Sequence, residues 1–147
     1  MTLKLLLIVA VTVPAVLSFH DNDTTLEIYA RWKARLAKEH PECTQATGAT
    51  EGEVNQFFDL LLLSPTSTFK CFLNCMYEGF NFFTDDRSID IDELIRDVEH
   101  VTDHMVDVCV GKYDKATEKC EKAYELAFCL THYNNIYKVQ LADDSDS

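Results

Sequence analysis

The chain contains six cysteines, and their spacing restricts its possible folds more than any other feature of the sequence. The gaps between successive cysteines are 27, 3, 33, 10 and 8 residues. Zinc sites usually use CxxC pairs or histidines interleaved at ligand spacing, and these gaps fit neither pattern. An even number of cysteines instead favours disulfides, provided that the chain reaches an oxidising compartment. The six are Cys43, Cys71, Cys75, Cys109, Cys120 and Cys129.

The first 18 residues have the layout of a secretory signal peptide. Lys4 supplies one positive charge, an apolar run follows over residues 5–17, and the small side chain of Ser18 suits a cleavage site. The run is too short to span a bilayer comfortably, and Pro14 interrupts it. We therefore expect residues 1–18 to be removed, and the rest to be secreted, not inserted into a membrane, and cross-linked by three disulfides.

The charge balance narrows the choice of partner. The chain has 25 acidic and 13 basic residues, for a formal net charge of −12. Such a surface repels phosphates, which argues against nucleic acid or an anionic membrane as the partner. Residues 19–142 are long enough for one helical domain, and the polar sequence DDSDS at 143–147 is expected to be a disordered tail.

Apolar residues recur at three- and four-residue spacing, which is typical of amphipathic helices, whereas strand patterns are missing from the sequence. Helix-start signals near residues 24, 50, 66 and 90 and stop signals at Pro41 and Pro65 divide the chain. Two further helices are expected over 103–110 and about 116–133. The prediction is an all-α fold, a compact and irregular bundle of about six helices.

Helical geometry limits how the cysteines can pair. Cys71 and Cys75 are four residues apart, so they share one helix face and can each reach a different neighbouring element. Cys120 and Cys129 are nine apart, about half a turn out of phase, so the last helix should be held on two sides. Many pairings of six cysteines remain compatible with these two limits.

The whole pattern resembles the insect odorant-binding protein family, also called the pheromone and general odorant-binding family. Its most constant cysteine gaps, x3 and x8, both occur here, and KCEKAYELAFCL at 119–130 is similar to the family segment around the last two cysteines. The resemblance covers all of the chain after the signal peptide. It implies about six helices around a closed apolar cavity and three interlocked disulfides, Cys43 with Cys75, Cys71 with Cys120, and Cys109 with Cys129.

The resemblance implies a non-enzymatic, secreted carrier of small hydrophobic ligands such as odorants, pheromones or related semiochemicals. An olfactory receptor or a second copy of the chain are the further partners it suggests. The sequence has no GxSxG, no HExxH and no phosphate-binding glycine loop, so we predict no catalytic residue, cofactor or metal. Residues on the apolar helix stripes are predicted to contact the ligand, although each could equally serve core packing. They are Phe72, Met76, Phe80, Leu94, Val98, Met105, Val108, Tyr124 and Phe128.

The roles of residues 134–144 and of two histidines are open hypotheses. Residues 134–144 could cover the cavity as a lid, with the Tyr137 hydroxyl contacting the ligand, or they could form a surface tail. His100 and His104 could release the ligand on acidification or bind a metal together with His132, or they could simply be surface residues.

Three rival functions are considered. A salivary or haemolymph scavenger of biogenic amines or lipid mediators would keep the fold, and an amine would need a carboxylate in the cavity. Glu78, Asp107 and Glu125 are the candidates for that role. The second rival is an interaction protein with a filled core that acts through its acidic surface. The third is a hydrolase, for which the sequence offers no residues.

Overall fold

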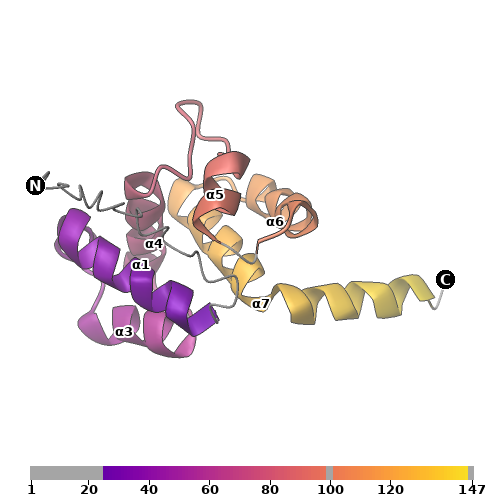
Figure 1. Ribbon diagram of the computed structural model, residues 1–147, viewed down its shortest axis with the longest axis horizontal. Coiled ribbons are helices and arrows are strands. Elements are labelled where there is room, and N and C mark those ends of the chain that lie inside the picture. Colours follow the sequence, from indigo (N-terminus) through magenta and orange to yellow (C-terminus); the bar gives the residue numbers. More distant parts are fainter. Residues whose placement is uncertain (1–24, 99–100, 146–147) are drawn as a thin grey trace, which may run out of the picture.

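The computed structural model describes residues 25–98 and 101–145, with side chains described as far as Tyr133. This part of the chain forms seven helices, and its β structure is limited to one isolated bridge between Phe83 and Ile89. The predicted all-α fold is therefore confirmed. The predicted signal peptide lies outside the described residues. The helices are α1 (Thr25–Glu39), α2 (Glu42–Thr47), α3 (Glu51–Leu60), α4 (Ser67–Gly79), α5 (Ile91–Asp97), α6 (Asp103–Lys115) and α7 (Lys119–Ser145), shown in Figure 1.

Side-chain caps explain where four of the helices begin. Thr50 accepts a hydrogen bond from the amide of Glu53 at 3.2 Å, and the Glu53 carboxylate accepts one from the amide of Thr50 at 2.9 Å. Thr66, Asp90 and Thr102 cap α4, α5 and α6 in the same manner, each accepting from the amide three residues on. These caps satisfy backbone donors that the first turn leaves free, and they confirm the predicted helix starts.

The observed helices differ from the sequence prediction by one missed helix and two later helix ends. The short helix α2 was missed, because Pro41 was taken only as the end of α1. Helix α6 continues through Gly111 to Lys115, beyond the predicted end at residue 110. Helix α7 continues past Tyr133 to Ser145, so it includes residues 143–145 of the predicted tail. No proline or glycine follows Gly111 in the sequence, and the backbone therefore meets no helix breaker there.

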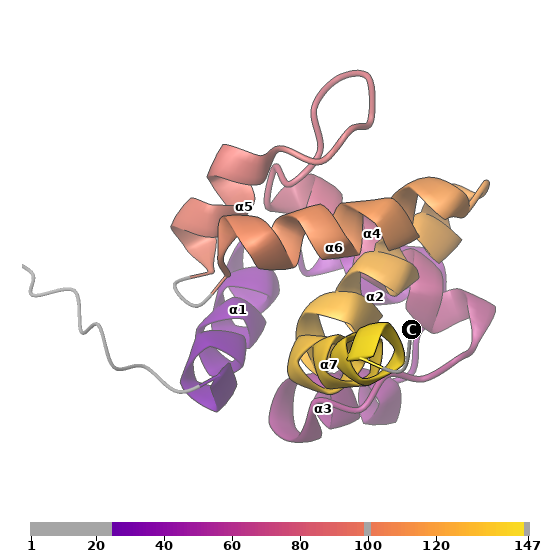
Figure 2. The ribbon, with the colours of Figure 1, turned by 90° about the vertical axis from the view of Figure 1, so that its right-hand side faces the viewer.

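Helix α4 lies at the centre of the fold. It packs against α7 and α2, while α6 packs against the other side of α7 and α1 packs against α3. Figure 2 views α7 nearly end-on, and Figure 1 shows its last turns extending away from the other helices. The core between the helices is strongly aromatic, with edge-to-face contacts such as Phe57 to Phe69 at 5.7 Å and Trp32 to Phe80 at 5.7 Å.

Three disulfides cross-link these helices in the pairing that the family resemblance implied. They join α2 to α4 (Cys43–Cys75), α4 to α7 (Cys71–Cys120) and α6 to α7 (Cys109–Cys129). Each closed loop stabilises the fold by about 3 to 4 kcal/mol in the chain-entropy model.

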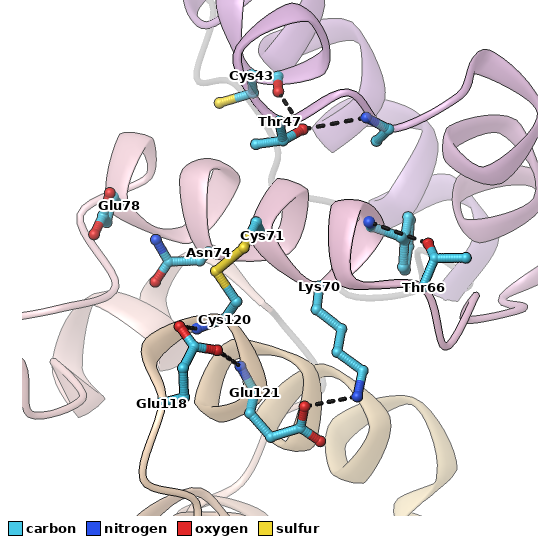
Figure 3. Close-up of a disulfide and its surroundings, with 12 residues drawn as sticks. Cys43, Thr47, Thr66, Lys70, Cys71, Asn74, Glu78, Glu118, Cys120 and Glu121 are labelled. Atoms are coloured by element: carbon cyan, nitrogen blue, oxygen red, sulfur yellow. Dashed lines mark hydrogen bonds and ion pairs between the residues drawn. A yellow bond between two sulfur atoms is a disulfide. The ribbon is translucent and has the colours of Figure 1, made fainter.

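The central disulfide is reinforced by charged side chains (Figure 3). Beside Cys71, Lys70 donates to the carboxylate of Glu121 at 2.6 Å, which ties α4 to α7 a second time. The Glu118 carboxylate accepts from the amides of Cys120 and Glu121 at 3.0 Å each, and these backbone hydrogen bonds lower its pKa. The first turn of α7 is thus held by a disulfide, an ion pair and a carboxylate cap.

Candidate functional site

A partly enclosed cavity of about 60 Å³ lies between α1, α4, α6 and α7, next to the end of α5. Its lining is mostly apolar. No aspartate, glutamate, lysine, arginine or histidine is among the described residues that line it. The lining residues are Thr25, Ile28, Tyr29, Trp32, Tyr77, Val98, Val101, Met105, Leu130 and Thr131.

Helix α1 supplies the largest share of this lining because of its helical spacing. Thr25, Ile28, Tyr29 and Trp32 are separated by three or four residues, so they share one face of the helix. The Trp32 ring packs edge-on against Tyr77 at 6.5 Å between ring centroids, which joins the α1 wall to α4. The cavity is therefore bounded on this side by rigid, tightly packed aromatic rings.

Two tyrosine side chains supply hydroxyl groups to the lining. The Tyr29 hydroxyl and the Thr131 hydroxyl are hydrogen-bonded at 2.9 Å, which links α1 to α7. Burial raises the pKa of Tyr29, and the bond to Thr131 offsets part of that rise. Burial also raises the pKa of Tyr77 well above its ordinary value, with a smaller contribution from nearby Tyr29. Both phenols are therefore neutral and able to donate hydrogen bonds.

Helix α5, beside the cavity, contains no cysteine and is joined to α1 by an ion pair at its end. Both oxygens of the Asp97 carboxylate accept from the Arg35 guanidinium at 3.1 Å, which ties the end of α5 to α1. The same guanidinium lies over the Phe80 ring, 4.3 Å from its centroid. Since Val98 directly follows Asp97, this ion pair positions a residue of the cavity wall.

The residues that the sequence predicted to contact the ligand lie in several different environments. Val98 and Met105 line the cavity. Val108 and Tyr124 are half-buried against the core, and Phe128 is 39% exposed and stacks on His132. Tyr137 lies outside the residues whose side chains are described. Four others are fully buried in the core and are not among the lining residues: Phe72, Met76, Phe80 and Leu94.

Sequence reasoning missed most of the α1 and α4 contributions to the cavity. Tyr29 and Trp32 follow the three- and four-residue spacing of an apolar helix face, but that spacing does not separate a residue facing a cavity from one facing another side chain. Tyr77 was missed because the chosen stripe of its helix ran through Phe72, Met76 and Phe80. A tyrosine at an otherwise apolar buried position was the available signal, since a buried hydroxyl needs a partner.

The acids proposed for amine binding lie elsewhere. Glu78 forms an ion pair with Arg87, and Asp107 is exposed on α6. Glu125 borders a separate polar groove of about 320 Å³ at the end of α6, together with Lys112 and Lys115. None of the three acids lines the cavity.

The histidines show no metal-binding arrangement within the described part of the chain, where no group of three or more potential ligands is found. The His104 ring meets Tyr133 edge-on at 6.2 Å. His132 donates to the backbone carbonyl of Phe128 at 3.0 Å. His100 lies outside the described residues, so the proposed pH switch stays a hypothesis.

A more open groove of about 260 Å³ lies between α1, α2 and α3. Leu36, Val54 and Phe58 give it an apolar floor, and Lys33 and His40 stand at its border. Lys33 is already paired with Asp59 at 2.9 Å.

Among the described helices, none has the length and apolar character needed to cross a membrane.

Comparison with known proteins gives one match, to a protein family. No curated protein and no solved structure matches the chain. The model of the PBP/GOBP family matches residues 28–133, a span that begins at cavity residue Ile28 and includes all six cysteines. That family implies binding of small hydrophobic ligands such as odorants. On this match, which covers well over half of its length, the chain belongs to the PBP/GOBP family.

Proposed function

We propose that this protein is a secreted carrier that encloses a small hydrophobic molecule, such as an odorant or pheromone, and transports it through an aqueous extracellular fluid. The observation that carries the proposal is the cavity between α1, α4, α6 and α7, whose described lining residues are uncharged, with hydroxyl groups and the indole N–H of Trp32 as their polar side-chain groups. Burial of ligand surface there contributes about 25 cal/mol for each Å² removed from water.

The cavity must widen to accept such a ligand. Its volume of about 60 Å³ is well below the roughly 300 to 1,000 Å³ of typical small-molecule sites. Disulfides fix α4 and α6 to α7, whereas α1 and α5 contain no cysteine. We therefore infer that the widening occurs at the junction of α1 with the end of α5, which the Arg35–Asp97 ion pair joins. Part of the gain from ligand burial is then used to displace this wall.

A neutral cargo is favoured over an amine. An ammonium group buried in this cavity would lose its hydration and find no carboxylate among the described lining residues. The alternative function as a scavenger of biogenic amines therefore has no support in this cavity. A neutral lipid mediator fits the apolar lining as well as an odorant does.

The test is competition against a fluorescent apolar probe, using oxidised protein without its signal peptide. A Met105→Trp variant should bind the probe at least tenfold more weakly, because the larger side chain occupies the cavity. The control is Leu62→Trp, which adds the same side chain at a position that is 54% exposed and away from the cavity. Equal affinities of both variants, or no binding by the unaltered protein, would contradict the proposal.

A further inference from the structure

We propose that the Tyr77 hydroxyl is the hydrogen-bond donor that orients the ligand, so that the cavity selects neutral apolar molecules carrying one acceptor oxygen. Ketones, aldehydes and esters are the ligands of this class. The inference rests on the proposed carrier function and adds to it the chemistry of the cargo.

The Tyr77 hydroxyl has no hydrogen-bond partner among the described residues. Tyr77 is 1% exposed, and its ring packs against Trp32, Phe82 and Phe83. Buried tyrosine hydroxyls normally find a partner. Tyr29 bonds to Thr131, and Tyr113 donates to the backbone carbonyl of Arg87 at 2.6 Å. Tyr77 therefore differs from these two buried tyrosines.

The surroundings of the Tyr77 hydroxyl place it at the cavity. Every fully inaccessible polar side-chain atom in the described part of the protein has a hydrogen-bond partner. The unpartnered Tyr77 hydroxyl must accordingly border open space, although the residue as a whole is buried. Tyr77 is one of the residues lining the cavity, so the cavity is the space that its hydroxyl faces.

The protonated phenol and the uncharged lining determine which ligand chemistry fits the cavity. Burial raises the pKa of Tyr77, so the phenol keeps its proton and can donate a hydrogen bond to an acceptor oxygen. No charged residue lines the cavity within the described part of the chain, so an ammonium or carboxylate ligand would be buried without a counter-charge. A carbonyl oxygen accepts the hydrogen bond and adds no charge.

The experiment compares a ketone with the alkene of the same skeleton, in which a methylene group replaces the oxygen. The unaltered protein should bind the ketone about three- to tenfold more tightly than the alkene, the range expected for one net hydrogen bond. Tyr77→Phe should abolish this preference, so that the ketone and the alkene bind with equal affinity. Tyr124→Phe is the control, because Tyr124 is half-buried outside the cavity, and it should preserve the preference.

A second measurement needs no ligand. Thermal unfolding of Tyr77→Phe should occur at the same or a higher temperature than that of the unaltered protein, because the variant loses only an unpartnered hydroxyl. Tyr29→Phe should unfold at a lower temperature, because it leaves the Thr131 hydroxyl without its partner. A decrease in Tyr77→Phe as large as that in Tyr29→Phe would overturn the inference.

The binding results separate this inference from the proposed function. If the unaltered protein binds ketone and alkene, and Tyr77→Phe retains the ketone preference, the inference alone is overturned. If the unaltered protein binds neither compound and no apolar probe, the carrier function fails and the inference fails with it. Tighter binding of an amine or carboxylate of the same skeleton would also overturn the assignment of a neutral cargo.

Discussion

Phe72 and Phe128 were both predicted to contact the ligand, and the structure gives them different environments. Phe72 is fully buried, packing edge-on against Phe58 at 6.5 Å and stacking on Phe69 at 5.7 Å. Phe128 is 39% exposed and stacks on Tyr124 and His132 at the surface of α7. Truncating each to alanine removes the same atoms, so the difference between the variants reports burial alone.

Phe72→Ala should lower the free energy of unfolding by about 3 to 5 kcal/mol, because it loses the transfer energy of a buried ring and leaves a cavity. Phe128→Ala should cost less than about 1 kcal/mol, as most surface substitutions do. Urea denaturation of the oxidised protein measures both values. The free energy of unfolding of a protein of this size falls by about 1.5 kcal/mol per M urea, so Phe72→Ala should lower the urea concentration at the unfolding midpoint by roughly 2 to 3 M. Equal shifts in the two variants would refute the placement of Phe72 in the core.

Two further predictions concern charged groups. Hydrogen bonds from Ser64, Thr66 and Thr50 lower the pKa of Glu53 from 4.5 to about 2, so stability present above pH 4.5 is lost as the pH falls toward 2. Glu53→Gln should therefore lose less thermal stability than the unaltered protein between pH 4.5 and 2, and an identical loss would disagree with this network. Asp97→Asn breaks the paired contact with Arg35 and should speed ligand dissociation by about two- to fivefold. The exposed Asp92→Asn on the same helix is its control, and faster dissociation in both would argue against a specific attachment.

The helix starts were predictable because each depends on a short, specific pattern. A threonine or aspartate cap acts within three residues, as at Thr50 and Asp90. The prediction that Cys71 and Cys75 each reach a different neighbouring element is confirmed by their bonds to α7 and α2. The pairing itself came from the family resemblance, since helical geometry left several alternatives open.

The cavity was harder to predict because helical periodicity identifies only the inward face of a helix. Phe72 and Tyr77 are both on inward positions of α4, but only Tyr77 reaches the cavity. The difference depends on how α1 and α6 pack around α4, which the sequence of α4 does not contain. Val98 and Met105 line the cavity because they lie on segments that close it near the end of α5, and their contact with a ligand stays a prediction.

The central claim is that a neutral apolar ligand enters the cavity between α1, α4, α6 and α7. The most direct test is methyl NMR of the oxidised protein during titration with a small ketone. Chemical-shift changes should concentrate on the methyl groups lining the cavity. They should spare Leu36 and Val54 in the outer groove, which is the open groove between α1, α2 and α3. The cavity methyl groups belong to Ile28, Val98, Val101, Met105 and Leu130. Changes confined to the outer groove, or no saturable change at all, would contradict this claim.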